Sequence, residues 1–285
     1  MRRLRIEHLT TYEFGGWVQL MPHRLLLRPR EGYDIRIESS RLDISPACQV
    51  KWHRDVYGNS TGTAEFALMA DKLHIASTVI VQHFDDSPMD FLISSEAVQY
   101  PFLYKQSEQE ILKPYQTTCY PDDFAAVTQW ANQFHRTGQS IGTFDLLFSM
   151  NKAIANGFRY QSREAPGVQS PGETLKSSTG SCRDFATLFM EACRVLGLGS
   201  RFVSGYLHCP GTAAGSGSTH AWTEVYLPGA GWKGFDSTSG LMTGPDHIAV
   251  AVSRHPADLP PVSGSFVGPG GVIPSLFVAV QVQVI

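Results

Sequence analysis

The chain has 285 residues, of which 42% are hydrophobic and 17% are charged, so it can bury sizeable cores and is not disordered. Its formal net charge of −3 argues against nucleic acid or an anionic membrane as the main partner, and it contains no apolar run of the roughly 18 residues that a membrane span requires. The five cysteines are odd in number and include no CxxC pair, which is typical of reduced thiols, so we expect a cytoplasmic protein without a disulfide framework.

Residues 1–84 are expected to form a β-rich domain. The first residues alternate between polar and apolar side chains, as in a strand and unlike a signal peptide. Two further alternating runs, DIRIESSRLDIS and KLHIASTVIVQ, are separated by turn-forming stretches such as YGNSTG. This pattern predicts an N-terminal antiparallel β-sandwich-like domain. Residues 85–118 are poorly periodic and are predicted to be a connector on the surface.

Helical periodicity begins in a predicted second domain, residues 119–256. Segments 121–138 and 143–157 each place apolar residues on one face and reach a glycine at the end. Their predicted buried residues are Phe124, Val127, Ala131 and Phe134 in the first helix, and Phe144, Leu147, Phe148 and Ile154 in the second. A Pro/Gly/Ser-rich loop over 162–180, a helix from 182, and strands over 200–207, 220–227 and 231–237 follow. Residues 257–285 are a Pro/Gly-rich tail that ends in a strand, and the fold class is α+β.

Cys182 stands at the first position of the third predicted helix. Ser181 is a suitable N-cap, and Asp184 three residues later completes a box-like S-x-x-D. The predicted buried stripe of this helix is Phe185, Leu188, Phe189, Ala192, Val195 and Leu196. Unpaired N–H groups and the positive end of the helix dipole favour a thiolate at the helix start. Cys193, at the edge of the apolar stripe, is predicted to be packing only.

A thiolate nucleophile requires a base, and the base requires an orienting group. His220 opens a strand, and Asp236 lies near the end of the strand that returns after the turn at 228–231. A hairpin would bring the two side chains together at one end of a sheet. We expect Nε2 of His220 to face the thiolate and Nδ1–H to be held by the carboxylate.

The register of this hairpin decides whether the arrangement is possible. Opposed residues share a face, and their numbers sum to a constant. A turn that opposed Leu227 with Trp232 would give an odd sum and put Asp236 opposite Thr223, on the face away from His220. We therefore predict an even sum, produced by an odd-numbered loop or a β-bulge, with Asp236 opposite Glu224, Trp222 or His220.

The order GSCRDFATLFMEACRVLGLGSRFVSGYL, then HAWTEVYLPGAGWKGFDSTSG, resembles the core of the bacterial transglutaminase-like superfamily. HLTTYEF, MPHRLLLRPR and HRDVYGNST resemble the β-rich N-terminal domain of the same family, and together the matches span about residues 10–82 and 142–240. The resemblance implies a papain-like catalytic core over 119–256. By matched position, it makes Cys182 the nucleophile, His220 the base and acid, and Asp236 the orienting group.

The sequence departs from the family at three places. Members often carry Gln directly after the cysteine and His five positions beyond it, where this chain has Arg183 and Thr187. Many carry Asp-Pro-Thr where this chain has Asp236-Ser237-Thr238. None of these differences removes a catalytic group.

Four further residues are candidates for supporting roles. Tyr160 is a candidate oxyanion donor, beside the backbone N–H of Cys182. Arg183 and Asp184 either have a helix-capping or solvated role or contact substrate. Trp222 either shields the triad from water or packs in the core.

The predicted reaction is acyl transfer at a peptide or carboxamide bond through a thioester on Cys182. Transfer to water makes a cysteine protease or amidase, and transfer to a lysine amine makes a transglutaminase crosslink. A non-catalytic binding scaffold is the third possibility. No cofactor and no metal are expected, because the sequence has neither a calcium loop nor metal-ligand spacing. The expected partner is a peptide or protein substrate, not a nucleic acid or a membrane.

Overall fold

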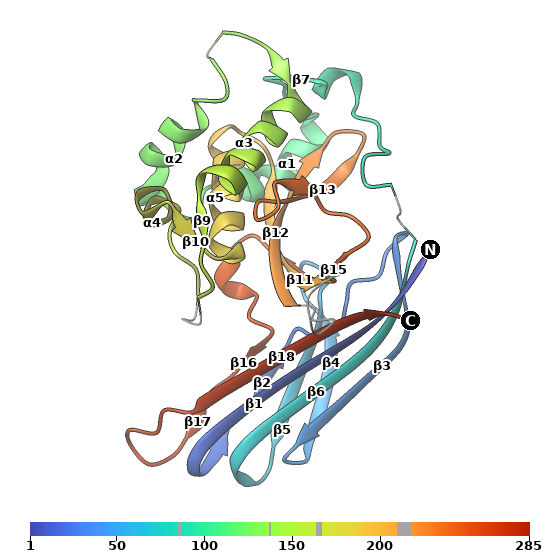
Figure 1. Ribbon diagram of the computed structural model, residues 1–285, viewed down its shortest axis with the longest axis vertical. Helices are drawn as coiled ribbons and strands as arrows, with labels where there is room; N and C mark the ends of the chain where they lie inside the picture. Colours follow the sequence, from blue (N-terminus) through green and yellow to red (C-terminus); the bar gives the residue numbers. More distant parts are fainter. Residues whose placement is uncertain (85–86, 137, 164–166, 210–217) are drawn as a thin grey trace.

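The computed structural model describes residues 1–84, 87–136, 138–163, 167–209 and 218–285. A β-rich part and a part that combines a sheet with helices lie one against the other (Figure 1). None of the helices in these described ranges is long and apolar enough to span a membrane.

Two antiparallel sheets make up the β-rich part. The first has the order β17-β1-β6-β3, with β18 also paired to β1; its strands are β1 (Arg2–Leu20), β3 (Ile35–Ser45), β6 (Met69–His83), β17 (Phe266–Val267) and β18 (Ser275–Val284). The second has the order β16-β2-β5-β4; its strands are β2 (His23–Leu25), β4 (Cys48–Arg54), β5 (Ser60–Phe66) and β16 (Val262–Ser263).

Alternation along the strands places one set of side chains between the two sheets. Val18 of β1, Leu25 of β2, Ala64 of β5 and Leu73 of β6 are fully buried in one cluster that both sheets share. The predicted antiparallel β-sandwich-like domain is therefore confirmed.

The C-terminal strand belongs to this N-terminal part. The sequence predicts a strand at the end of the chain, and β18 forms it; its partner is β1, in a register that runs from Leu4 opposite Val284 to Glu13 opposite Ser275. The two chain ends consequently lie side by side in one sheet (Figure 1).

The second part is built on a five-stranded antiparallel sheet of order β14-β13-β12-β11-β15. Its strands are β11 (Ser200–Leu207), β12 (Ser218–Leu227), β13 (Gly231–Asp236), β14 (Leu241–Met242) and β15 (His247–Ser253). The helices are α1 (Gln106–Gln116), α2 (Phe124–Ala131), α3 (Thr143–Gly157), α4 (Pro171–Ser177) and α5 (Cys182–Val195). Short pairs β7 (Gln99–Tyr100) with β8 (Ile141–Gly142) and β9 (Arg159–Tyr160) with β10 (Thr179–Gly180), and 3₁₀ turns η1 (Ser95–Ala97), η2 (Pro121–Asp123) and η3 (Pro256–Asp258), complete it.

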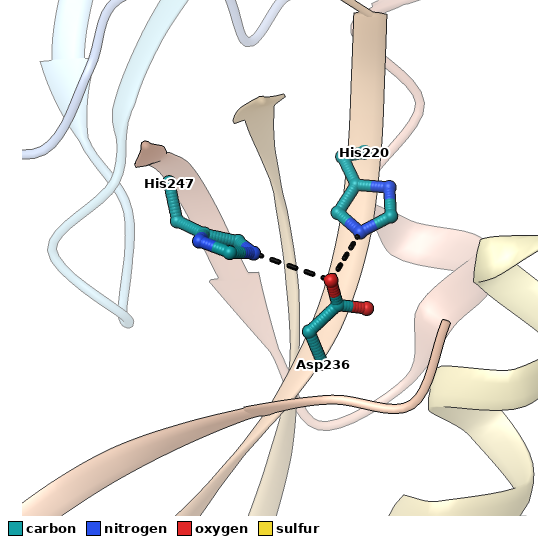
Figure 2. A group of neighbouring side chains, drawn as sticks. All are labelled: His220, Asp236 and His247. Atoms are coloured by element: carbon teal, nitrogen blue, oxygen red, sulfur yellow. Dashed lines mark hydrogen bonds and ion pairs between the residues drawn. The ribbon is translucent and has the colours of Figure 1, made fainter. Parts of the chain in front are cut away.

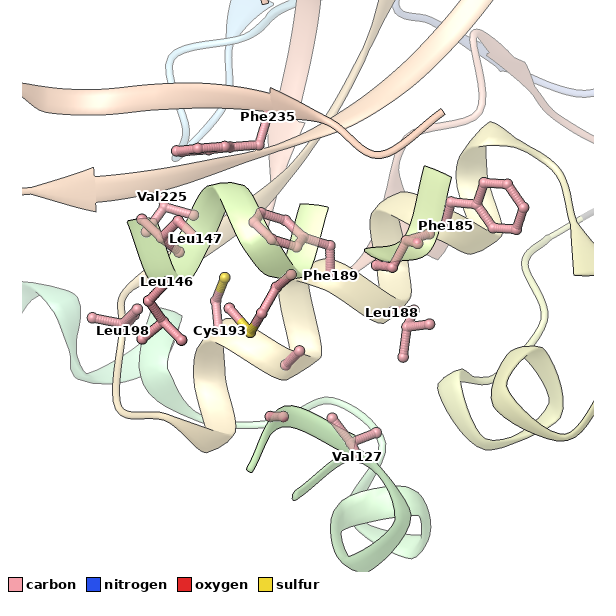
Figure 3. Close-up of a cluster of buried hydrophobic side chains, with 14 of the residues drawn as sticks. Val127, Leu146, Leu147, Phe185, Leu188, Phe189, Cys193, Leu198, Val225 and Phe235 are labelled. Atoms are coloured by element: carbon pink, nitrogen blue, oxygen red, sulfur yellow. The ribbon is translucent and has the colours of Figure 1, made fainter. Parts of the chain in front are cut away.

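Helix α5 packs in two apolar clusters. Phe185, Leu188 and Phe189 pack with α2, α3 and Phe235 of β13 in one apolar cluster (Figure 3). Ala186 and Met190, on the other side of the helix, belong to a second cluster shared with β1, β6, β11 and β15. The expectation of a helix with one buried stripe is wrong, because every residue from Asp184 to Arg194 is buried.

Several predicted boundaries also need correction. The 85–118 connector contains helix α1, of which Leu112 alone is buried, and the loop over 162–180 contains helix α4. That loop includes residues 164–166, and the connector includes 85–86, which lie outside the described residues. The helix predicted over 121–138 is shorter, and Phe124 at its start is exposed. The helix predicted over 143–157 has those bounds in the structure.

Candidate active site

Helix α5 begins at Cys182, as the sequence predicts, and buried polar contacts hold this helix start. The backbone N–H and the hydroxyl of the N-cap Ser181 both donate to the carboxylate of Asp184, at 2.8 and 2.9 Å. Asp184 is fully buried and also lies 2.7 Å from the guanidinium of Arg163. Cys182 itself is partly exposed. Cys182 thus stands at a fixed helix end and remains partly exposed.

The hairpin of β12 and β13 has the predicted register. Thr223 pairs with Phe235 and Leu227 pairs with Gly231, so the pair numbers sum to an even constant across a three-residue loop. Continued by one residue, this register puts Asp236 opposite Trp222, on the same face as His220. Glycines with positive φ at 229 and 231 form the turn. The parity prediction is confirmed.

His220 and Asp236 meet inside the protein. Nε2 of His220 lies 3.1 Å from Oδ2 of Asp236, and their side chains are 6% and 2% exposed. Within the described residues, this nitrogen has no well-aligned hydrogen-bond acceptor, so the contact is a close ion pair. Loose alignment of this kind is common in substrate-free active sites. The expected orientation of the ring is wrong: Nε2 faces the carboxylate, which leaves Nδ1 for the thiol.

The Asp236 carboxylate is held by several donors. Oδ1 accepts the backbone N–H of Thr238 at 2.9 Å, and Oδ2 accepts the hydroxyl of Ser239 at 3.0 Å. Asn151 donates to the backbone carbonyl of Asp236 at 3.3 Å. Burial would raise the pKa of Asp236, but the contacts with His220 and His247 outweigh it and hold the pKa well below its usual range.

The charge state of His220 follows from the same contacts. Burial would lower its pKa, but the close contacts with Asp236 and Cys182 outweigh burial and raise the pKa of His220 to about 10. A histidine that interacts with both the carboxylate and the thiol is suited to stabilise a thiolate–imidazolium pair.

His247 is a further residue of this site, and no sequence motif marks it. Its Nε2 lies 3.3 Å from Oδ2 of Asp236, so both imidazoles reach the same carboxylate oxygen (Figure 2). The ligand-type atoms of His220, Asp236 and His247 lie within 4.8 Å of one another, and these are the residues of this site that could hold a metal ion. His247 follows a turn on β15, a strand that pairs with β11, so no local sequence pattern links it to Asp236.

The other predicted site residues lie around this cluster. Tyr160 is half exposed, and its pKa is raised by burial and by the charge of Cys182. Arg183 donates to the backbone carbonyl of Arg163 at 2.9 Å. Trp222 is 2% exposed, and its ring centroid lies 6.3 Å from that of His220. Cys193 is fully buried in the apolar cluster around α5, as predicted for a packing residue.

Two family models match the chain. The model of the transglutaminase-like superfamily matches residues 128–237, and that of the bacterial transglutaminase-like N-terminal region matches residues 4–82. The first range contains Cys182, His220 and Asp236, and the second covers most of the N-terminal sandwich.

One curated relative and two solved structures are similar to this chain over most of its length. An uncharacterized protein of Mycobacterium leprae (strain TN) is 25% identical over 278 residues, which cover 95% of each chain. A crystal structure from Cytophaga hutchinsonii, named "Putative Cysteine Protease", has a TM-score of 0.75 at 19% identity and covers 99% of this chain and 90% of its own. The periplasmic domain of TgpA from Pseudomonas aeruginosa is 14% identical, with 82% and 87% covered and a TM-score of 0.37. The chain therefore contains a transglutaminase-like core, which is preceded by the bacterial transglutaminase-like N-terminal region.

Proposed function

We propose that the protein is a cysteine-dependent hydrolase that cleaves peptide or carboxamide bonds through a thioester on Cys182. The observation that carries the proposal is the single contact chain of three side chains: a thiol at a helix start, a buried histidine that interacts with it, and a buried carboxylate 3.1 Å from that histidine. Nucleophile, base and orienting group are the parts that acyl transfer requires.

In the proposed reaction, the Cys182 thiolate attacks the carbonyl carbon, and a C–S bond forms as the carbonyl oxygen becomes an oxyanion. His220 gives a proton to the leaving amine, the C–N bond breaks, and a thioester remains. Water then attacks the thioester and loses a proton to His220, and the acid leaves as the C–S bond breaks. Asp236 stays ionised throughout and orients His220.

The oxyanion requires donors near the sulfur. We assign this role to the backbone N–H of Cys182 and to the Tyr160 hydroxyl. Tyr160 lies opposite Gly180 in the parallel pair of β9 and β10. Gly180 is two residues before Cys182, so this pairing brings Tyr160 near the start of α5. A donor removed from such a site typically lowers kcat by about 10²-fold or more.

The remaining candidates are given supporting roles. Asp184 fixes the start of α5, and Arg183 fastens the neighbouring segment through the carbonyl of Arg163. Trp222, buried behind His220, excludes water from the ion pair. None of the three is assigned contact with substrate.

The experiment that tests the proposal is incubation with a glutamine-containing peptide and a tagged primary amine, followed by mass spectrometry. Hydrolysed peptide, absent with Cys182→Ala, is the expected product. Amine incorporation would instead support a transglutaminase-type crosslinking enzyme. Unmodified peptide and protein across a panel of peptides would contradict acyl transfer and favour a binding scaffold.

The state of the cysteines supports a proposal for the cellular localisation of the protein. No disulfide joins the cysteines in the described part of the chain. We propose a cytoplasmic protein that acts on peptides or proteins without a cofactor and without nucleic acid or membrane partners. Cell fractionation that recovers the protein outside the cytoplasm would contradict this localisation.

A further inference from the structure

His247, at the start of β15, shares one carboxylate oxygen with His220. Its Nε2 lies 3.3 Å from Oδ2 of Asp236, while Nε2 of His220 lies 3.1 Å from the same atom (Figure 2). The side chain of His247 is 11% exposed. The catalytic arrangement proposed above gives this second imidazole no role.

The backbone determines where His247 carries its proton. Its Nδ1 accepts the N–H of Gly244 at 3.2 Å. A neutral imidazole that accepts at one nitrogen is protonated at the other, so His247 presents Nε2–H to Asp236. The ring plane is also restricted, because Trp222 packs edge-on against it at 5.3 Å between centroids.

The same proton position argues against a metal centre formed by His220, Asp236 and His247. A histidine that binds a metal coordinates through an unprotonated nitrogen, and its other nitrogen donates to a carbonyl or carboxylate. In His247 the second nitrogen accepts a backbone N–H instead. The observations therefore favour a hydrogen-bond donor to Asp236 over a metal ligand.

We propose that His247 is a positioning residue of the active site. It donates Nε2–H to Oδ2 of Asp236 and, with the Ser239 hydroxyl, keeps this oxygen turned toward His220. This inference rests on the proposed function, because it concerns the group that orients the base. Without the donor, the carboxylate can rotate away, and the thiolate–imidazolium pair of Cys182 and His220 weakens.

Other titratable groups around the cluster come from several elements. Tyr160 of β9 interacts electrostatically with Cys182 and Asp236, and Cys209 interacts with Asp246 and Asp236. His208 and Asp246 lie 2.8 Å apart. A change in the pH dependence of Cys182 reactivity can therefore be attributed to His247 only with variants that alter His247 alone.

The test is the rate of Cys182 alkylation by iodoacetamide as a function of pH, which needs no knowledge of the substrate. His247→Leu removes the donor, and His247→Gln keeps an N–H near the position of Nε2. For His247→Leu we expect the acid limb to move up by about one pH unit, which is roughly a tenfold lower rate on that limb. His247→Gln should stay within about twofold of the parent, as should the control His255→Gln.

An unchanged profile for His247→Leu, or equal losses for His247→Leu and His247→Gln, would overturn the proposal. An unreactive Cys182 in the parent would overturn the proposed function and this inference with it, so the two failures are distinct. A second measurement does not depend on the folding of a variant: nitrogen-15 NMR of the parent should show His247 protonated at Nε2, and protonation at Nδ1 would contradict the proposal.

Discussion

The cysteines differ in their surroundings, and the differences bear on reactivity. Burial raises the pKa of the thiols of Cys48, Cys193 and Cys209, which disfavours their thiolates. Cys182 stands apart because it lies at a helix start and interacts with His220. These surroundings predict that Cys182 is the most reactive of the five thiols.

Substitution of the three central residues should give graded losses of turnover. Cys182→Ala should abolish hydrolysis of any peptide that the parent cleaves, and His220→Ala should lose nearly as much. Asp236→Ala should retain a rate roughly 10- to 100-fold above that of Cys182→Ala, because the orienting group is the most dispensable of such a set. Steady-state kinetics with matched folded variants measures this, and an active Cys182→Ala protein would refute the mechanism.

The buried ion pair should make stability depend on pH. Because the pKa of Asp236 is lower in the folded protein, its ionised carboxylate stabilises the fold above about pH 4, the pKa of an unfolded aspartate. This stabilisation is lost as the pH falls below that value. The raised pKa of His220 contributes stability that is complete below about pH 6.5 and is lost as the pH rises toward about 10.

The difference in thermal midpoint between the parent and Asp236→Asn should thus be largest between about pH 4 and 6.5. Calorimetry across pH 3–10 measures it, with the exposed Asp43→Asn as a control that should change little. A difference that grows steadily from pH 6.5 to 10 would contradict the assigned pKa shifts.

The site residues that could be predicted are those that lie next to a local sequence pattern, such as a helix cap. Ser181 and Asp184 mark a helix start, so the position of Cys182 could be predicted. The requirement that Asp236 share a face with His220 predicted the even register of the hairpin. The ring orientation of His220 could not be predicted from the sequence, because it depends on side-chain torsion angles. His247 was missed because a nonlocal strand pairing brings it to Asp236.

At the scale of elements, periodicity located helices and did not reveal their surroundings. Helix α3 has the predicted bounds, because its apolar face and its terminal glycine are both local signals. Helix α1 was missed: it contains Pro114 and buries only Leu112, so it lacks an apolar stripe. Helix α5 is buried from Asp184 to Arg194, although its sequence includes charged residues. Glu191 and Arg194 can be buried because they form an ion pair at 2.7 Å.

Strand β11 passes close to Trp222, whose ring lies beside that of His220. A Cβ at Gly205 would lie 2.3 Å from the carbonyl oxygen of Ile248 and 2.6 Å from the ring of Trp222. Gly205→Ala should therefore destabilise the protein by roughly 1–3 kcal/mol and lower activity through a displaced Trp222.

The matched control for that change is Gly157→Ala, at the end of α3, where a Cβ meets nothing within 4 Å. Denaturant unfolding of both variants gives the comparison. Equal stabilities would mean that β11 and Trp222 are not packed as described.

At the scale of the whole molecule, the two parts share a core. Leu4 and Ile6 of β1, with Val282 of β18, are buried in one cluster with Ala186 and Met190 of α5. Polar contacts add to it: His8 of β1 lies 2.9 Å from the hydroxyl of Tyr206 on β11. The family resemblance predicted both parts, but the tail strand that joins them could not be placed, because an alternating strand does not specify its partner.

Asn59 is the polar contact between the parts that is most open to test. It is fully buried, and its side chain donates to the carbonyl of Val252 at 2.8 Å and accepts the N–H of Val252 at 2.9 Å. Asn59→Ala would leave both backbone groups unpaired, at an expected cost of about 2–4 kcal/mol. Urea unfolding should show this loss, with the exposed Asn132→Ala as control; a neutral Asn59→Ala would contradict the shared interface.

The most direct test of the central claim, that Cys182 is a nucleophile activated by His220, is a comparison of the alkylation rates of the five cysteines. Folded protein is treated with limiting iodoacetamide at pH 6–7, and each site is quantified by peptide mapping. We predict that Cys182 is modified well before Cys48, Cys119, Cys193 and Cys209, and that His220→Ala removes this advantage. Labelling of Cys182 at or below the rate of the other partly exposed thiols, or unchanged labelling in His220→Ala, would contradict the account.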